Sequence, residues 1–323
     1  MKRFLAAVVA VTTALALTAC GSSSTNTTTD DKSAESTDDT TYKIGVLQLT
    51  QHAALDKANE GFIAALDESG IKYEVDQQNA SGEQSACQTI AEKLVNDGND
   101  LIYAIATPAA QAVAGVTSEI PIVLSAVTDP AESGLVASND APGGNVTGTS
   151  DLTPVKEQIE LLKQILPDAK TVGILFCSSE SNSEIQAAMA REACEANGLE
   201  HIDFTVSSSN EIQTVVESMV GKVDVIYAPT DNTIAAGMPT VSMIATDNGL
   251  PIICGEQGMV DAGGLATYGI DYYQLGYMAV EILRDGADPA TMPIGYLSAD
   301  QCELSVNDET AAALGIDVSG LKK

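Results

Sequence analysis

The sequence predicts an α/β protein with two similar lobes, each built around a parallel β-sheet. The main observation is an internal repeat, because Asn99–Ala104 (NDLIYA) is echoed by Val223–Ala228 (VDVIYA). Each copy is followed by a second matching segment, Ile120–Leu124 in the first case and Leu250–Cys254 in the second. About 280 residues follow a polar N-terminal stretch, which is more than one hydrophobic core normally supports. Ligands of open parallel sheets collect beyond the carboxyl ends of the strands, so two such lobes would share one cleft.

Short apolar runs predict the strands of both lobes. The run over 43–49 is apolar enough for a buried parallel strand, and the pattern restarts at Lys170. In chain order, strands are expected over 43–49, 73–77, 101–106, 121–127, 171–177, 201–206, 223–228, 250–254, 265–270, 293–297 and 303–306.

Apolar residues at helical spacing predict helices between these strands, and Gly70 is expected to end the first of them. Ser81 and Gln84 form a capping-box pattern, and Thr107–Pro108 has the pattern of an N-cap followed by proline. The helix expected over 272–285 has no counterpart in the second lobe. We therefore expect it to return to the first lobe, so that the chain crosses between the lobes three times. The other helices are expected over 55–66, 87–95, 155–166, 185–193, 212–219 and 233–248 (interrupted at Pro239), from Pro108, and after Asn307 as far as Gly315.

The N-terminus has the pattern of an export signal. Lys2 and Arg3 precede an apolar run over 4–17, which is too short for a comfortable membrane span. Leu17–Gly21 (LTACG) looks like a bacterial lipobox, in which Cys20 receives a diacylglycerol and becomes the mature N-terminus. The alternative is an ordinary secretory signal with a chance cysteine. We expect a signal peptide over 1–19, the lipidated cysteine with a disordered polar tether over 20–41, and anchoring at the outer face of the cell membrane.

Composition narrows the possible functions. The net charge is −30, so binding to nucleic acid is disfavoured. The sequence contains no glycine-rich phosphate loop, no nucleophile elbow and no HExxH motif, and its two histidines lie far apart. We therefore expect no enzymatic activity, no cofactor and no metal. Five cysteines follow Cys20 without a CxxC pair; a single disulfide among them remains open. They are Cys87, Cys177, Cys194, Cys254 and Cys302.

The motifs along the chain resemble those of a known family. They are Tyr42–Val46 leading to His52–Asp56, Ile122 to Asp129–Pro130, Asn145–Asp151, Asp231–Asn232 and Tyr268–Tyr273. The chain is similar to the lipid-anchored substrate-binding proteins of ABC importers, which have the periplasmic-binding-protein type I fold, and within them to the group linked to tryptophan and tyrosine uptake. It departs from the family at Phe176–Ser179, where Tyr-Asn-Pro or similar is frequent.

The resemblance implies two Rossmann-like lobes with parallel sheets, joined by a three-crossover hinge. Lobe 1 would comprise 42–148 plus 272–294, and lobe 2 would comprise 149–271 plus 295–323. The protein would be a monomer that captures an amino acid, most consistently Trp, Tyr or Phe, and delivers it to the permease and ATPase subunits of the importer.

The loops at the strand ends share a chemistry that suits a zwitterion. They contain carboxylates and no Lys or Arg, and several lead into helix N-termini, whose amides bind anionic groups. An α-amino acid has the matching charges. The candidate ligand-binding residues are Gln48, Thr107, Pro108, Asp129, Ser150, Asp151, Ser179, Asn182, Ser183, Thr230, Asp231, Asn232, Glu256 and Asp271.

Within this set, we expect the ligand carboxylate to meet Ser179, Asn182 and Ser183. The resemblance makes Asp271 the strongest partner for the ligand ammonium, with Asp129 or Asp231 as helpers. Helix capping alone would also explain Thr107, Asn182, Thr230, Asn232 and Asp271. His52 is expected to be a surface or capping residue and His201 a structural one.

Two alternatives stay open. The first is a surface sensor or adhesion lipoprotein with the same fold and no transport role. The second is a binding protein for a sugar or nucleoside, which the low aromatic content of 4% and the absence of Trp disfavour, because sugar sites usually contain stacked rings.

Overall fold

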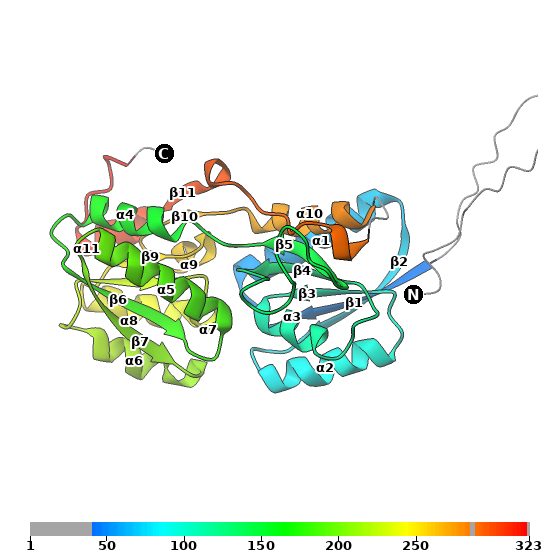
Figure 1. Ribbon diagram of the computed structural model, residues 1–323. Helices are drawn as coiled ribbons and strands as arrows, with labels where there is room; N and C mark the ends of the chain where they lie inside the picture. Colours follow the sequence, from blue (N-terminus) through cyan, green and yellow to red (C-terminus); the bar gives the residue numbers. More distant parts are fainter. Residues whose placement is uncertain (1–40, 285–287, 322–323) are drawn as a thin grey trace, which may run out of the picture. The chain divides into compact units, whose positions relative to one another are not determined.

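The computed structural model of the protein describes residues 41–284 and 288–321. The expected signal peptide, Cys20 and nearly all of the expected tether lie outside the described residues. Thr41, which was assigned to the tether, is already the first residue of strand β1 and pairs with Lys72. From Thr41 onward the chain forms one unit that contains two β-sheets (Figure 1).

The first sheet has the strand order β2-β1-β3-β4-β5, and all of its pairings are parallel. Its strands are β1 (Thr41–Gln48), β2 (Lys72–Asn79), β3 (Leu101–Ile105), β4 (Ile122–Val127) and β5 (Val146–Ser150). Their carboxyl ends therefore meet at one edge of the sheet.

The second sheet has the order β11-β10-β9-β8-β6-β7, and only β11 runs antiparallel within it. A strand expected over 293–297 is not formed in this described segment; Gly295 makes a single parallel bridge with Thr149 instead. The strands are β6 (Thr171–Cys177), β7 (Glu200–Val206), β8 (Val225–Ala228), β9 (Ile252–Cys254), β10 (Ala266–Gly269) and β11 (Glu303–Val306).

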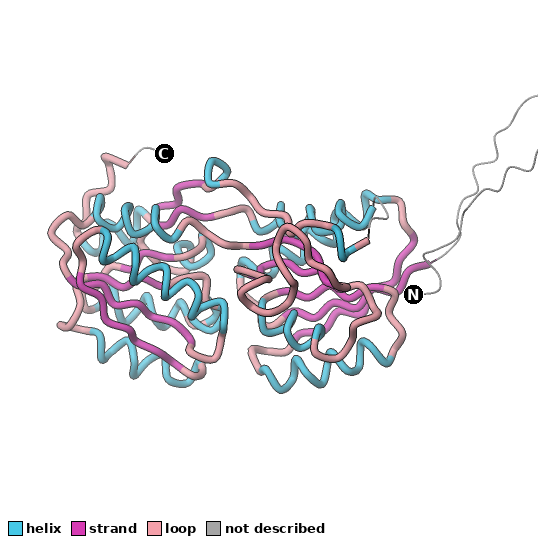
Figure 2. Tube along the Cα trace, in the orientation of Figure 1, coloured by secondary structure: helices cyan, strands magenta, loops and turns pink. Residues whose placement is uncertain are grey.

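Helices pack on both faces of each sheet (Figure 2). Those next to the first sheet are α1 (Ala53–Ser69), α2 (Gln84–Asn96), α3 (Thr107–Ala114) and α10 (Tyr272–Arg284). Those next to the second are α4 (Val155–Ile165), α5 (Ser181–Ala196), α6 (Ile212–Met219), α7 (Asn232–Ala236), α8 (Met238–Asp247), α9 (Gln257–Asp261) and α11 (Asp308–Leu314). A 3₁₀ turn at Ser209–Glu211 precedes α6, one at Pro289–Thr291 lies next to β5, and one at Ala299–Gln301 precedes β11. The prediction of two α/β lobes with mostly parallel sheets is confirmed.

Helix α10 joins the first lobe through a very close contact with α1. A Cβ atom added at Gly276 would lie 1.8 Å from the carbonyl oxygen of Ala58, and one at Gly61 would lie 2.0 Å from that of Tyr273. Glycine at both positions lets the two backbones touch, which explains why the chain returns to this lobe after Asp271.

Some local predictions differ from the structure at helix starts. Gly70 ends α1 in the left-handed conformation, as predicted. The predicted capping box is not formed, because α2 begins at Gln84 after Glu83, while Ser81 has a φ of 54°. Thr107 is the first residue of α3 and not its cap; the cap position belongs to Ala106, with a φ of 83°.

The two lobes have separate hydrophobic cores, and the repeated tyrosine is central to each. Tyr103 and Tyr227 are fully buried. Tyr103 stacks on Phe62 with ring centroids 3.8 Å apart, whereas the Tyr227 hydroxyl donates to Gln158 Oε1 at 2.7 Å. The same repeat therefore anchors one lobe by ring packing and the other by a buried hydrogen bond. The five cysteines of the described chain are free, so the disulfide left open is not formed.

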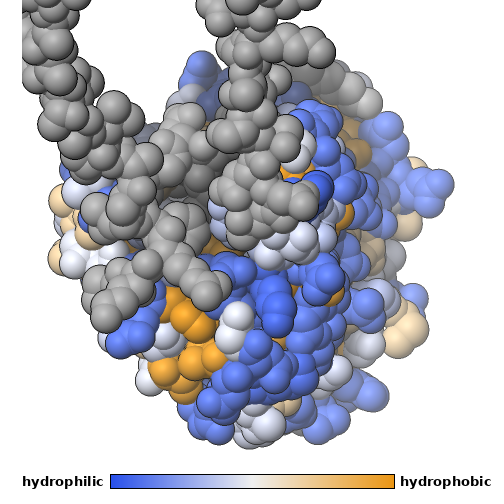
Figure 3. Space-filling view, turned by 90° about the vertical axis from the view of Figure 1, so that its right-hand side faces the viewer, coloured by the Kyte–Doolittle hydropathy of each residue, from blue (hydrophilic) through white to orange (hydrophobic). Residues whose placement is uncertain are grey.

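The surface agrees with the composition. The part of the face in Figure 3 that is not covered by grey atoms is mostly hydrophilic, with one hydrophobic area in its lower part. Among the described residues, none of the helices is both long enough and apolar enough to cross a membrane.

Candidate functional site

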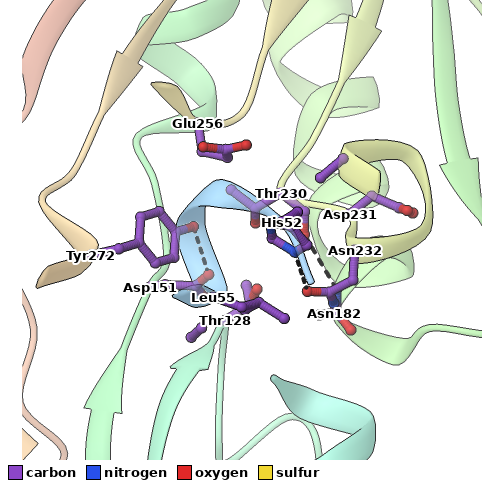
Figure 4. A pocket seen from close by; sticks show the side chains of 12 residues that line it. His52, Leu55, Thr128, Asp151, Asn182, Thr230, Asp231, Asn232, Glu256 and Tyr272 are labelled. Atoms are coloured by element: carbon purple, nitrogen blue, oxygen red, sulfur yellow. Dashed lines mark hydrogen bonds between the residues drawn. The ribbon is translucent and has the colours of Figure 1, made fainter. Parts of the chain in front are cut away.

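Loops from both sheets meet around a small, largely enclosed pocket (Figure 4). The first lobe contributes residues from the start of α1, the ends of β4 and β5, and the start of α10. The second lobe contributes the starts of α5, α7 and α9 and the loop after β8. The lining residues are His52, Leu55, Ala126, Thr128, Asp151 and Tyr272 from the first group, and Asn182, Thr230, Asp231, Asn232, Ala235 and Glu256 from the second.

Hydrogen bonds between the lobes close this pocket. Gln186 on α5 donates from Nε2 to Thr128 Oγ1 at 3.0 Å, and also to Thr230 Oγ1. At the rim, Gln84 Nε2 donates to the carbonyl oxygen of Ser179 at 2.7 Å, and Gln111 Nε2 donates to a serine hydroxyl of α5 at 3.2 Å. The structure therefore shows the lobes in a closed arrangement.

Three carboxylates line the pocket, and within the described residues no Lys or Arg does. Asp151, Asp231 and Glu256 are each at most 5% exposed. Burial raises the pKa of Asp151 to about 6 and those of Asp231 and Glu256 to about 7. Such a site lacks positive charge and is suited to receive a cation.

Two of these carboxylates already have strong hydrogen-bond partners. Asp231 caps α7, since its Oδ1 accepts from the Ile234 amide at 2.7 Å and its Oδ2 from the Cys177 amide at 2.5 Å. Glu256 caps α9 by accepting from the amides of Gly258 and Met259. Both are therefore structural anchors of the second lobe.

Asp151 differs, because one of its oxygens is free. The Tyr272 hydroxyl donates to Oδ2 at 2.8 Å, whereas Oδ1 is buried without a hydrogen-bond partner. Tyr272 lies at the start of α10, directly after the second crossover between the lobes, and fixes the carboxylate from the hinge side. Asp151 thus presents a preoriented acceptor to the pocket, and Figure 4 shows it beside Tyr272.

A buried relay orients His52 on the opposite side of the pocket in Figure 4. Glu180 accepts from Asn232 Nδ2 at 2.6 Å, so the amide oxygen of Asn232 faces His52, whose Nε2 lies 3.2 Å away. Burial lowers the pKa of His52, so the imidazole is neutral near pH 7. Its Nε2 then carries the proton, and Nδ1 is a buried acceptor without a partner.

Asn182 supplies another unpaired acceptor. Its Nδ2 donates to Glu180 Oε2, to the Ser183 hydroxyl and to the carbonyl oxygen of Thr230, at 3.2–3.3 Å. Its Oδ1 has no partner. Every pocket atom that is buried and unpaired among the described residues is therefore an acceptor, which calls for a ligand that donates hydrogen bonds.

The structure brings six of the fourteen predicted ligand-binding residues into the pocket lining. These are Asp151, Asn182, Thr230, Asp231, Asn232 and Glu256. The other eight do not line it: Gln48, Thr107, Pro108, Asp129, Ser150, Ser179, Ser183 and Asp271.

Of the residues expected at the two ligand ends, Asp271, Ser179 and Ser183 lie outside the pocket lining, and Asn182 lies within it. Asp271 is exposed and caps α10, with Oδ1 accepting from the Gln274 amide at 3.1 Å, and it is not among the residues that line the pocket. Ser179 is exposed and Ser183 lies behind Asn182. The free atom of Asn182 is an oxygen acceptor, which would repel a ligand carboxylate.

Several predicted residues support the pocket from behind. Gln48 donates to the Thr50 carbonyl and to Asp56, both at 2.7 Å, and so holds the loop that carries His52. Ser150 donates to the Thr128 carbonyl at 2.6 Å. Asp129 accepts from Asn139 and from nearby amides and thereby fixes its own turn.

Six lining residues were missed by the sequence prediction: His52, Leu55, Ala126, Thr128, Ala235 and Tyr272. Thr128 and Tyr272 are direct neighbours of the predicted Asp129 and Asp271, so within each motif the pocket lining contains the residue next to the predicted one. His52 stands at the N-cap position of α1 and makes no side-chain capping bond, which leaves its ring for the pocket.

Comparison with known proteins gives consistent results. Residues 43–320 match the family model of the ABC transporter substrate binding protein. A curated tyrosine-binding protein from Clostridioides difficile (strain R20291) is 44% identical over 289 residues, which cover 87% of this chain and 83% of that protein.

Two solved structures are similar in sequence and in fold. The ABC domain in complex with L-Trp from Streptococcus pneumonia is 41% identical with a TM-score of 0.83, covering 86% of this chain and 96% of that one. The ligand-free, open structure of a substrate-binding protein with adhesive properties from Clostridium difficile is 43% identical with a TM-score of 0.64, covering 85% and 95%. The lower TM-score against the open structure agrees with the closed lobes seen here. The chain belongs to the family of ABC transporter substrate-binding proteins.

Proposed function

We propose that the protein captures an aromatic amino acid, tyrosine or tryptophan, between its lobes and delivers it to an ABC importer. The observation that carries this proposal is the free, buried oxygen of Asp151 in a pocket without Lys or Arg. Relatives at 41–44% identity, one named a tyrosine-binding protein and one solved with L-Trp, support the choice of ligand.

The ammonium group of the ligand binds Asp151. Burial without a neighbouring cation raises the pKa of this carboxyl to about 6. The ionised carboxylate therefore has no charged partner in the protein, and the ligand ammonium supplies one. Tyr272 holds the second oxygen at 2.8 Å, which orients the first toward the incoming N–H groups. An ammonium is chosen over a metal because the described residues contain no cluster of three potential metal ligands.

The carboxylate of the ligand binds the hydroxyls of Thr128 and Thr230. Both oxygens accept from Gln186 Nε2, so each hydroxyl proton can go to another acceptor; for Thr128 the neighbouring Asp151, whose pKa its hydroxyl lowers, competes with the ligand for that proton. One threonine comes from each lobe, and Gln186 connects them, so ligand binding and lobe closure support each other. Neutral donors can hold an anion without adding a cation to the site.

The side chain of the ligand lies among apolar lining groups from both lobes. Leu55 and Ala126 come from the first lobe and Ala235 from the second. Besides His52, the aromatic residue in the pocket lining is Tyr272, and its hydroxyl already donates to Asp151. A stacked sugar site would need more ring surface than these residues provide.

The N-terminal sequence pattern and the family support a proposal for where the protein acts. We propose an extracytoplasmic protein, held at the outer face of the membrane by a lipid on Cys20. Cys20→Ala should release the mature domain into the soluble fraction of the host cell. If the variant stays in washed membranes, the anchor lies elsewhere.

A thermal-shift screen of amino acids, sugars and nucleosides tests the ligand class. A ligand that binds only the native state stabilises it by RT ln(1 + [L]/Kd), about 2.7 kcal/mol at a hundredfold excess over Kd. Tyrosine and tryptophan should raise the melting temperature. If only sugars or nucleosides do so, the proposal is wrong.

An additional adhesive role is the second candidate, because a relative at 43% identity is described as having adhesive properties. Deletion of the gene separates the two roles. Loss of amino-acid uptake with normal attachment supports transport alone, and loss of attachment that is restored by a variant unable to bind ligand supports adhesion.

A further inference from the structure

We propose that His52 determines ligand specificity: its unprotonated Nδ1 accepts a hydrogen bond from the phenol O–H of tyrosine or the indole N–H of tryptophan. The inference rests on the proposed function and adds to it a reason why phenylalanine, which has no side-chain donor, should be excluded.

The tautomer of His52 is fixed by Asn232, which lines the pocket, and by Glu180, which lies behind Asn232 and outside the lining. Glu180 is 3% exposed and accepts from the side-chain and backbone N–H groups of Asn232 and from Thr233. Since a carboxylate can only accept, Asn232 must turn its NH₂ group toward Glu180 and its oxygen toward His52. The Asn232 oxygen in turn requires the proton on His52 Nε2. The relay therefore leaves Nδ1 as an acceptor in every ligand-bound molecule.

Nδ1 is also unsatisfied by the protein itself. It has less than 1 Å² of accessible surface and no hydrogen-bond partner, although the residue as a whole is partly exposed. A buried acceptor without a hydrogen-bond partner is unfavourable. A ligand that donates a hydrogen bond to it therefore gains binding affinity, and a ligand that covers it without donating loses binding affinity. Asn182 Oδ1 is in the same condition.

The ammonium group of the ligand is a poorer match for His52. A full positive charge is best placed at Asp151, the carboxylate with a free oxygen, and Figure 4 shows His52 beside Asn232, away from the Asp151–Tyr272 pair. The pocket thus has an anionic acceptor at one side and neutral acceptors at the other. An amino acid with a neutral donor at the far end of its side chain complements both.

Binding constants for three ligands test this inference. Calorimetry on the wild-type chain should show phenylalanine binding at least roughly 100-fold more weakly than tyrosine, because sites built around a ligand O–H or N–H strongly reject the analogue that lacks it. 4-Fluoro-L-phenylalanine, which fills nearly the same space as tyrosine without donating, should bind as weakly as phenylalanine. This comparison needs no variant and holds even if a substitution at His52 prevents folding.

Variants locate the effect at His52. His52→Leu should reduce the preference for tyrosine over phenylalanine at least tenfold. His52→Asn keeps an oxygen at the place of Nδ1 and should retain most of the preference. Thr107→Val is the matched control, because the Thr107 hydroxyl is also buried and unpaired but lies outside the pocket lining. It should leave the preference unchanged.

The outcomes separate this inference from the function on which it rests. If the wild type binds no amino acid, the proposed function fails. If it binds tyrosine, tryptophan and phenylalanine with similar affinity, or if His52→Leu weakens all three equally, the role of His52 is refuted while amino-acid binding stands.

Discussion

Replacing Asp151 by asparagine removes the charge assigned to the ligand ammonium while keeping the local geometry. The asparagine oxygen can still accept from the Tyr272 hydroxyl, so the hinge contact at 2.8 Å is retained. Removing one partner of a buried charged hydrogen bond costs about 2–5 kcal/mol, because the other charge is left unpaired. At 1.4 kcal/mol per factor of ten, Asp151→Asn should weaken amino-acid binding by about 30-fold to several thousandfold.

The same substitution should not harm the ligand-free protein. Burial raises the pKa of Asp151 from 3.8 to about 6, so the ionised carboxylate destabilises the empty fold at pH 7. An uncharged asparagine avoids this cost. The melting temperature of ligand-free Asp151→Asn at pH 7.5 should therefore equal or exceed that of the wild type, although its ligand affinity is lost.

Tryptophan fluorescence provides a direct assay, because the chain contains no Trp and the ligand is then the only indole present. Asp271→Asn is the matched control: it removes a carboxylate from an exposed helix cap and should leave the affinity unchanged. If Asp271→Asn weakens binding and Asp151→Asn does not, the ammonium site has been assigned to the wrong side of the hinge.

Three further predictions follow from pH, helix packing and lobe closure. Below pH about 6 the ligand must displace the proton of Asp151, so its affinity should fall as the pH drops below that value and stay constant just above it. A wild-type affinity that does not change from pH 5 to 7, or a pH dependence that persists unchanged in Asp151→Asn, contradicts this. Gly276→Ala places a methyl group 1.8 Å from a carbonyl oxygen and should destabilise the fold by at least about 1–3 kcal/mol in chemical denaturation, whereas Gly144→Ala, with no atom within 4 Å, should not. Loss of Gln84 and Gln111 together removes two rim hydrogen bonds, each contributing about 0.5–1.5 kcal/mol, so the double alanine variant should bind all ligands several-fold more weakly and show a larger radius of gyration in X-ray scattering. An unchanged radius and affinity would show that these bonds do not hold the lobes together.

Much of the fold could be predicted because its signals are local. The repeated Leu101–Ala104 and Val225–Ala228 segments are continuous apolar runs, and both form central strands. Helix starts were less predictable. Thr107–Pro108 has the sequence of a cap, yet the left-handed backbone of Ala106 shifts the helix by one residue, and sequence periodicity does not report such a conformation.

The site was predicted at the level of loops and not of individual side chains. The strand-end loops lack Lys and Arg, and so does the lining of the pocket that the structure describes; that this pocket receives a positively charged group stays a prediction. Which carboxylate faces that group depends on tertiary contacts: Asp231 and Glu256 are occupied by helix amides, Asp271 points to solvent, and Asp151 is left with one free oxygen. The amides that occupy Glu256 and Asp271 are local, whereas the Cys177 amide on Asp231 and the Tyr272 hydroxyl on Asp151 come from distant parts of the sequence.

Mass spectrometry of the small molecule released from denatured, freshly purified protein tests the central claim most directly. The pocket is closed and surrounded by unpaired acceptors, so a tightly bound ligand should survive purification. We predict tyrosine or tryptophan at close to one molecule per chain, and neither compound from Asp151→Asn purified in parallel. Recovery of a sugar, a nucleoside or a carboxylic acid without an amino group would contradict the account.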